Sequence, residues 1–241
     1  MPLDGSNTEV TFTLDGRAVT AQPGESIWQV AQREGTDIPH LCYAPEPGYA
    51  ADGNCRACMV EVEGERTLAA SCIRQPTEGM VVSTATERAQ SSRKMVFELL
   101  AADQPPRDHA HDTGSKFWQW ADRLGIEDSR FPARLTPEPD LSHPAMAVNL
   151  DACINCTLCV RACRDVQVND VIGMAHRGAH AKIVFDFDDP MGDSTCVACG
   201  ECVRPAPQVH CCPRRSLHPK AASSRTVRWI LCVPIVASAA S

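Results

Sequence analysis

The sequence predicts an α+β protein, because two hairpins and a short helix follow one another near the N-terminus. Apolar and polar residues alternate over residues 11–20 around Asp15-Gly16, a pair typical of a tight hairpin turn. Ser26 can cap a helix that ends at Gly35, and a second hairpin is expected over residues 59–69. Together these elements indicate a small α+β unit.

The rest of the chain divides by composition. Residues 87–102 are expected to form a helix, with Met95, Leu99 and Ala102 at helical spacing. Residues 104–144 are rich in Pro, Asp, His and Arg and hold one expected short helix, over residues 117–124, which indicates a connector. Beyond the connector the cysteines return in two short clusters.

The composition limits the kinds of site and the classes of protein that fit this chain. The chain has 14 cysteines in 241 residues, so a disulfide scaffold or metal ligation is expected. The N-terminus shows no signal peptide, which favours a cytoplasmic location and ligation over disulfides. The net charge of -7 excludes a broadly basic nucleic-acid binder, and no apolar run is long enough to cross a membrane.

The first cysteine group consists of Cys42, Cys55, Cys58 and Cys72. Four thiolates are the ligands of a 2Fe-2S cluster, and a ligand loop completed by a fourth cysteine beyond a hairpin is typical of ferredoxin-type domains. Gly53 suits a backbone that must pass close to inorganic sulfide. A structural zinc site and plain buried thiols are the alternatives, and the long spacings favour the cluster.

Two further cysteine runs lie near the end of the chain. The first has the spacing C-x2-C-x2-C-x3-C and consists of Cys153, Cys156, Cys159 and Cys163; the second consists of Cys196, Cys199 and Cys202. In two-cluster bacterial ferredoxins the fourth cysteine of each run ligates the cluster of the other run. Cys163 is therefore expected to complete a 4Fe-4S cluster with the second run. A zinc module is the weaker alternative.

The other 4Fe-4S cluster lacks a ligand. Cys153, Cys156 and Cys159 need a fourth cysteine at position 206, where the sequence has Ala206 followed by Pro207. A three-iron form, an empty site and rescue by a later cysteine all remain open, the later cysteines being Cys211 and Cys212. One or two 4Fe-4S clusters are therefore expected.

No separate catalytic site is indicated, because the cysteines are accounted for as ligands and the chain has no GxGxxG or Walker motif. Arg56, Arg161 and Arg164 stand beside cysteines and could stabilise reduced clusters, but we expect them to be ordinary solvated charges. The other expected surface groups are the connector residues His109 and His111 and an acidic turn of Asp186, Asp188 and Asp189.

These motifs carry a resemblance to a known family. Ile38-Pro-His-Leu-Cys-Tyr43, Gly53-Asn-Cys-Arg-Ala-Cys-Met-Val-Glu-Val62 and the double cysteine motif resemble the N-terminal electron-transfer region of the alpha subunit of molybdenum or tungsten, NAD-dependent formate dehydrogenases. Asn149 to Asp189 is especially similar to those subunits. Related arrangements occur in the large iron-sulfur subunit of respiratory complex I, in iron-only hydrogenases and in the diaphorase iron-sulfur subunit of NAD-reducing hydrogenases.

The resemblance implies a β-grasp 2Fe-2S ferredoxin-like domain over residues 8–86, a helical and irregular connector over 87–145, and a 4Fe-4S dicluster ferredoxin-like domain over 146–203. The relatives usually carry one His and three Cys in the connector. No cysteine lies between Cys72 and Cys153 here, so that additional cluster is not expected. Residues 204–241 look unlike the family and are expected to form a poorly ordered tail.

The tail resembles the family when its codons are shifted by one base. From Pro205 the shifted codons allow Ala-Cys-Pro, which supplies the missing cysteine. Over Trp229 to Ser241 they allow Leu-Cys-Pro-Tyr-Cys-Gly-Val-Gly-Cys, similar to the opening motif of the molybdopterin catalytic domain. We therefore expect a one-base loss near the codon of Arg204, and a subunit truncated before its pterin domain.

The expected function is electron transfer. The resemblance implies that the intact enzyme oxidises formate to CO2 at a molybdenum or tungsten pterin and passes electrons to a flavin- and NAD-binding beta subunit. This chain alone is expected not to turn over formate, so its standing as an enzyme is open. A stand-alone iron-sulfur subunit of a diaphorase or complex I-like assembly and a zinc-stabilised interaction module are the alternatives.

Overall fold

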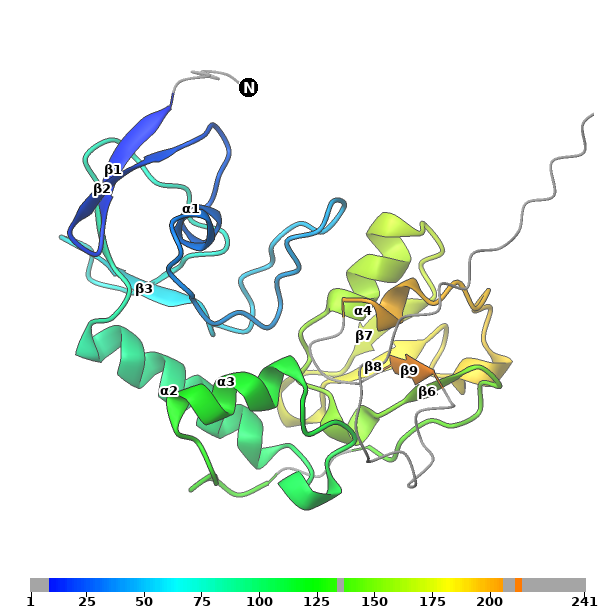
Figure 1. Cartoon of the computed structure of the whole chain (residues 1–241). Coiled ribbons are helices and arrows are strands. Elements are labelled where there is room, and N and C mark those ends of the chain that lie inside the picture. The colour runs from blue at the N-terminus through cyan, green and yellow to red at the C-terminus, as the bar shows by residue number, and fades with distance from the viewer. Residues whose placement is uncertain (1–8, 134–136, 206–210, 214–241) are drawn as a thin grey trace, which may run out of the picture.

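The structure is a computed structural model that describes residues 9–133 and 137–205 and the backbone of residues 211–213. Figure 1 shows the N-terminal strands at left with helix α1 beside them, helices α2 and α3 below, and a second group of short strands, β6 to β9, at right. The α+β class expected from the sequence is confirmed. Within the described residues, no helix is long and apolar enough to cross a membrane.

The N-terminal sheet is mixed and five-stranded, with the order β2-β1-β5-β3-β4. At its middle β1 and β5 run parallel, and Thr13 pairs with Val81. Both expected hairpins are present, since β1 pairs with β2 and β3 pairs with β4 in antiparallel register. The strands are β1 (Val10–Leu14), β2 (Arg17–Ala21), β3 (Met59–Val62), β4 (Ala69–Ala70) and β5 (Val81–Ser83).

Helix α1 (Ile27–Arg33) covers the core of this sheet. It begins at the predicted cap, where the Ser26 hydroxyl accepts a hydrogen bond from the Gln29 backbone and the Gln29 side chain accepts one from the Ser26 backbone. The apolar side of α1 is buried against strand residues such as Leu14 and Val82, and this burial stabilises the fold. A sheet wrapped on one helix fits the ferredoxin-like fold.

Helix α2 (Glu87–Ala102) has the predicted bounds, and helix α3 (Lys116–Leu124) occupies the second predicted segment. The two helices pack together through Phe97 and Phe117, whose rings stack with their centroids 5.7 Å apart. The buried residues of α2 are Ala89, Arg93 and Phe97. Met95 and Leu99, whose spacing supported the helix, are exposed because they lie outside that stripe.

The second part of the chain holds two small antiparallel sheets, β6 with β9 and β7 with β8. Its regular elements are β6 (Met146–Val148), α4 (Leu158–Arg161), β7 (Ile172–Ala175), β8 (Lys182–Phe185) and β9 (Cys211–Pro213). Short helical turns complete this part: η2 (Leu150–Ala152), η3 (Ala162–Val166, a π-helical turn), η4 (Gly178–His180), η5 (Met191–Asp193) and η6 (Glu201–Val203). A further turn, η1 (Arg107–His109), lies between α2 and α3.

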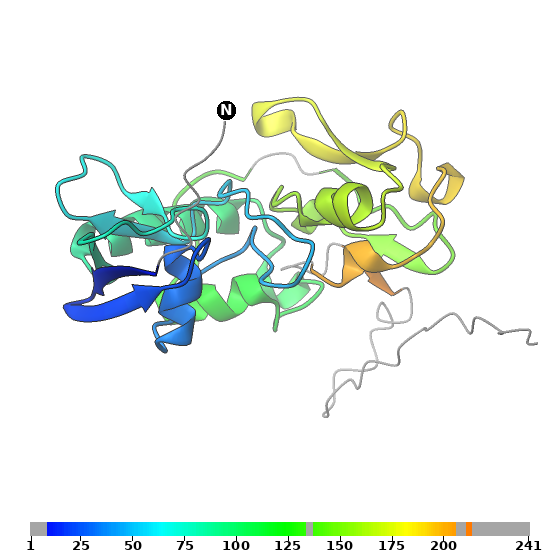
Figure 2. The same ribbon diagram turned by 90° about the horizontal axis from the view of Figure 1, so that it is seen from above.

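One loop of the N-terminal part packs against the second part of the chain. Residues 42–56, which we call the junction loop, follow α1 and extend toward the second part of the chain (Figure 2). Tyr43 belongs to the core under the N-terminal sheet, whereas Ala44 and Tyr49 belong to the core around α4. Cys55 packs against a third core, between α2 and α3. The junction loop therefore contacts all three apolar cores.

Candidate iron-sulfur centres

The first cysteine group comes together at the junction loop. Cys42, Cys58 and Cys72 are almost fully buried, and Cys55 is half-buried. The Cys58 thiol lies 3.3 Å from Cys72 Sγ, and the Cys55 backbone N–H donates to Cys42 Sγ at 3.5 Å. Hydrogen bonds from the Cys55 and Cys72 thiols lower the pKa of Cys42 to about 2. The structure thus brings all four predicted ligands of this group together.

Gly53 is required by the path of this loop. Its φ is +62°, a left-handed conformation that favours glycine. A Cβ at this position would lie 2.8 Å from Ile73 Cδ1, which is closer than carbon atoms approach in folded proteins. The neighbour that excludes a side chain in the structure is therefore Ile73, which follows Cys72.

The second cysteine run lies around the start of α4. Cys153 and Cys159 are buried, and Cys156 is half-buried. Asn155 and Thr157 take positive φ values of 52° and 61°, so the backbone reverses between the cysteines. Burial, and then the neighbouring Cys159, raise the pKa of Cys156 well above its ordinary value. Cys42 contributes to this rise, so a cysteine of the first group lies near this run.

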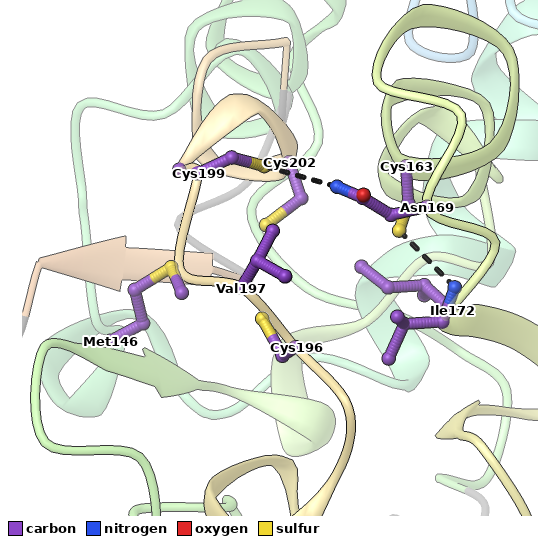
Figure 3. Close-up of a pocket in the computed structure, with 10 residues that line it drawn as sticks. Met146, Cys163, Asn169, Ile172, Cys196, Val197, Cys199 and Cys202 are labelled. Atoms are coloured by element: carbon purple, nitrogen blue, oxygen red, sulfur yellow. Dashed lines mark hydrogen bonds between the residues drawn. The ribbon is translucent and has the colours of Figure 1, made fainter. Parts of the chain in front are cut away.

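The third run shares one pocket with Cys163. This pocket is lined by Cys163, Cys196, Cys199 and Cys202, and Figure 3 shows these residues around it with Met146 and Val197. Asn169 also lines the pocket and donates a weak side-chain hydrogen bond to Cys199 Sγ at 4.0 Å. Position 206, expected to provide the fourth ligand of the other cluster, lies outside the described residues.

The donor chemistry of the three groups fits iron-sulfur clusters. In each group a backbone N–H is directed at a cysteine sulfur, an arrangement that stabilises sulfur carrying negative charge. The pairs are Cys55 to Cys42, Asn155 to Cys153, Val171 to Cys163 and Ala198 to Cys196, at 3.4–3.5 Å. Within residues 9–133 and 137–205 every cysteine carries a thiol rather than a disulfide. In the same residues no three His, Cys, Asp or Glu side chains are grouped as they would be around a single metal ion.

The three arginines beside the cysteines differ in burial. Arg56 is exposed, and Arg164 is exposed and pairs with the adjacent Asp165 at 2.8 Å. The expectation of a solvated charge is confirmed for these two and is wrong for Arg161, whose side chain is only 2% exposed. Arg161 is buried because its guanidinium is inserted between the junction loop and the second run, where backbone carbonyl oxygens accept its hydrogen bonds.

Other predicted surface groups lie where expected. His109 is exposed, and His111 contacts the Asp151 carboxylate at 2.9 Å. Asp186 and Asp188 take positive φ values and form the turn after β8. Two polar groups near the cysteines were not predicted: Asn169, and Arg93 of α2, which donates to the Met59 carbonyl at 2.9 Å. The only local indication in the sequence that Arg93 is buried is its helical spacing between Ala89 and Phe97, which places the three residues on one side of α2.

Parts of this chain are similar to known proteins. Residues 7–87 match the family described as a 2Fe-2S iron-sulfur cluster binding domain. The chain is 32% identical over 210 residues to the NADP-reducing hydrogenase subunit HndD of Solidesulfovibrio fructosivorans, a match that covers 82% of this chain and 35% of that protein. It is 36% identical over 180 residues to the mitochondrial NADH-ubiquinone oxidoreductase 78 kDa subunit of Candida albicans, covering 73% and 25%.

A third relative is a Staphylococcus haemolyticus protein, SH0748, whose name assigns it to the formate dehydrogenases; it is 27% identical over 198 residues, covering 81% of this chain and 20% of that protein. The chain therefore spans 20–35% of the length of these relatives. A solved chain of the NAD+-reducing NiFe-hydrogenase in the H2-reduced state has a TM-score of 0.76 and 27% identity, over 90% of both chains. The first part of this chain is a 2Fe-2S iron-sulfur cluster binding domain.

Proposed function

We propose that this chain is the iron-sulfur electron-transfer part of an NAD-dependent formate dehydrogenase. The observation that carries the electron-transfer role is the arrangement of the cysteines in three groups, each with a backbone N–H directed at sulfur. Iron-sulfur clusters, when bound, accept and release single electrons. The chain supplies their ligands, their burial and the charges around them.

Each cysteine group has a proposed cluster. The 2Fe-2S ligands are Cys42, Cys55, Cys58 and Cys72, and the ligands of one 4Fe-4S cluster are Cys163, Cys196, Cys199 and Cys202. Cys153, Cys156 and Cys159 would hold a second 4Fe-4S cluster that still needs a fourth ligand. Backbone N–H groups stabilise the thiolates, and burial of most of these sulfurs limits contact with water.

Two observations support formate as the substrate of the intact enzyme. Residues Asn149 to Asp189 resemble the alpha subunits of these dehydrogenases, and a relative named as a formate dehydrogenase matches 81% of this chain. In this proposal a molybdenum or tungsten pterin belongs to a later part of the same subunit. A flavin- and NAD-binding beta subunit is the proposed partner.

The alternative is a stand-alone iron-sulfur subunit of a diaphorase or complex I-like assembly. The match to the hydrogenase chain favours this alternative, because it covers 90% of each chain. The two functions are distinguished by restoring the reading frame after Arg204, so that the pterin domain is made, and isolating the assembly anaerobically through a tag on this subunit. Formate-dependent reduction of NAD supports our proposal, whereas reduction driven by H2 and not by formate supports the alternative.

The missing fourth ligand has a proposed origin in the reading frame after Arg204. The structure describes Arg204, which pairs with Glu46 at 3.0 Å, and the backbone of residues 211–213, which forms β9; most of the tail lies outside the described residues. Sequencing the coding DNA tests the frame directly. Codons that spell Ala-Cys-Pro one base earlier support the proposal, and codons that do not spell it contradict it.

A further inference from the structure

Arg161 connects two cysteine groups that are far apart in the sequence. Its guanidinium donates to the Cys42 carbonyl oxygen at 2.5 Å and to the Cys156 carbonyl oxygen at 3.2 Å. It also donates to the Ala50 carbonyl oxygen. One side chain of the second run therefore holds a backbone group of the first group, 119 residues earlier.

The positive charge of Arg161 is paired with a carboxylate of the junction loop. Its Nε lies 3.2 Å from Asp52 Oδ2, and the Asp52 carboxylate also accepts a hydrogen bond from the Thr157 hydroxyl at 2.7 Å. A buried guanidinium requires such partners, because removal from water is costly unless its donors are satisfied. Arginine suits this position better than lysine, since its planar fork donates to several oxygens in fixed directions.

The position of this network matters for the clusters. The two cysteines whose carbonyls it holds, Cys42 and Cys156, are proposed ligands of different clusters. The exposed residue Asn54 of the junction loop also donates to the Cys156 carbonyl oxygen at 3.5 Å and to the Thr157 hydroxyl at 3.2 Å. Tyr49 and Glu46 instead contact Glu201 and Arg204, outside the second cysteine run. Arg161 is therefore the buried group that joins the first and second cysteine groups.

We propose that Arg161 is a positioning residue that fixes the junction loop against the second cysteine run and places a positive charge beside the 2Fe-2S site. This inference rests on the proposed 2Fe-2S ligands. Reduction adds negative charge to a cluster, and a nearby buried cation favours the more negative state. Arg161 thus sets both the separation of the two sites and the ease with which the 2Fe-2S cluster is reduced.

The test uses the complete chain purified anaerobically, with Arg161→Gln, Arg161→Lys and the control Arg164→Gln. Arg164 is a matched control because it lies three residues away, also beside a cysteine, and is exposed. Iron and labile sulfide are measured first. The reduced fraction of the 2Fe-2S cluster is then followed by electron paramagnetic resonance at defined potentials, and hydrogen exchange is measured over residues 49–54.

Arg161→Gln is expected to lower the ratio of reduced to oxidised 2Fe-2S cluster about tenfold at a fixed potential and to accelerate exchange over residues 49–54. Arg161→Lys should restore most of the ratio, because it keeps the charge, but not the slow exchange. Arg164→Gln should change neither quantity. An unchanged ratio and unchanged exchange in Arg161→Gln would overturn the inference.

A second variant keeps the inference testable if Arg161→Gln does not fold. Asp52→Asn removes the partner carboxylate at a residue that is 40% exposed, and the unbalanced guanidinium should raise the ratio of reduced to oxidised cluster. A fall in the ratio, or no change, would contradict the assigned role of Arg161. Absence of iron from the unmodified chain would instead reject the proposed function, while the exchange data would still test the positioning role.

Discussion

The Tyr49 hydroxyl donates a hydrogen bond to Glu201 Oε1 at 2.9 Å, and this contact joins the junction loop to the turn between Cys199 and Cys202. Burial, followed by the hydrogen bond to Glu201, raises the pKa of Tyr49 above its ordinary value of 10.0. The phenol therefore binds its proton more tightly in the folded state than in the unfolded state. The stability that it contributes is present below pH about 10 and is lost as the pH rises through the folded-state pKa.

Replacing Tyr49 tests this contact. Tyr49→Phe is expected to lower the free energy of unfolding by about 2 kcal/mol at neutral pH, because a hydrogen bond to a carboxylate is lost. Above pH about 10 the stability of the unmodified protein should fall, and that of the variant should fall less steeply. Urea unfolding between pH 7 and 11 measures both effects, and equal slopes for the two proteins would argue against the contact.

Replacing two glycines in turn distinguishes destabilisation by backbone strain from destabilisation by side-chain crowding. Gly53 and Gly64 both have positive φ, but a Cβ at Gly53 would meet Ile73 whereas a Cβ at Gly64 would meet nothing within 4 Å. Gly64→Ala is expected to lower the free energy of unfolding by about 1–2 kcal/mol through φ alone. Gly53→Ala should lower it further, and Ile73→Val in the same chain should remove part of the difference. Equal losses in the two alanine variants would contradict this explanation.

Single cysteine replacements should remove one kind of cluster each. Cys55 and Cys199 are the more accessible members of their groups, so serine at either position should disturb packing little. Cys55→Ser is expected to abolish the 2Fe-2S signal and keep the 4Fe-4S signal. Cys199→Ser should abolish the signal of the 4Fe-4S cluster held with Cys163 and keep the 2Fe-2S signal. Iron analysis and electron paramagnetic resonance of both variants measure this, each variant serving as the control for the other. Loss of both signals in each variant would reject the separate ligand sets.

Asn169 should affect only the 4Fe-4S cluster held near Cys199. Its side-chain amide donates to Cys199 Sγ, and hydrogen bonds to sulfur favour the reduced cluster. Asn169→Ala is therefore expected to lower the ratio of reduced to oxidised 4Fe-4S cluster about threefold at a fixed potential, as for one modest hydrogen bond. The 2Fe-2S signal of the same sample is the internal control. A change of equal size in both clusters would exclude a local effect.

Local patterns predicted the elements better than their packing. The bounds of α2 and the capping of α1 by Ser26 follow from neighbouring residues, and the structure has both. The buried side of α2 could not be read from its apolar residues, because Arg93 is held there by the Met59 carbonyl of β3. That contact joins residues 34 positions apart, so the only local sign of it in the sequence is the spacing of Arg93 between Ala89 and Phe97.

The candidate sites show the same division. Cysteine spacing predicted the three groups, and the structure places Cys163 at the same pocket as the third run. The environment of Arg161 was predicted wrongly, because its burial depends on the carbonyl groups of Cys42 and Ala50. Both residues belong to a loop that precedes Arg161 by more than one hundred positions, so only the folded chain shows the contact.

The central claim, that this chain holds iron-sulfur clusters for electron transfer, is tested most directly by metal and sulfide analysis after anaerobic purification. We expect a brown protein with iron and labile sulfide in equal amounts and a reducible 2Fe-2S signal in electron paramagnetic resonance. A colourless protein that contains zinc and no labile sulfide would contradict it.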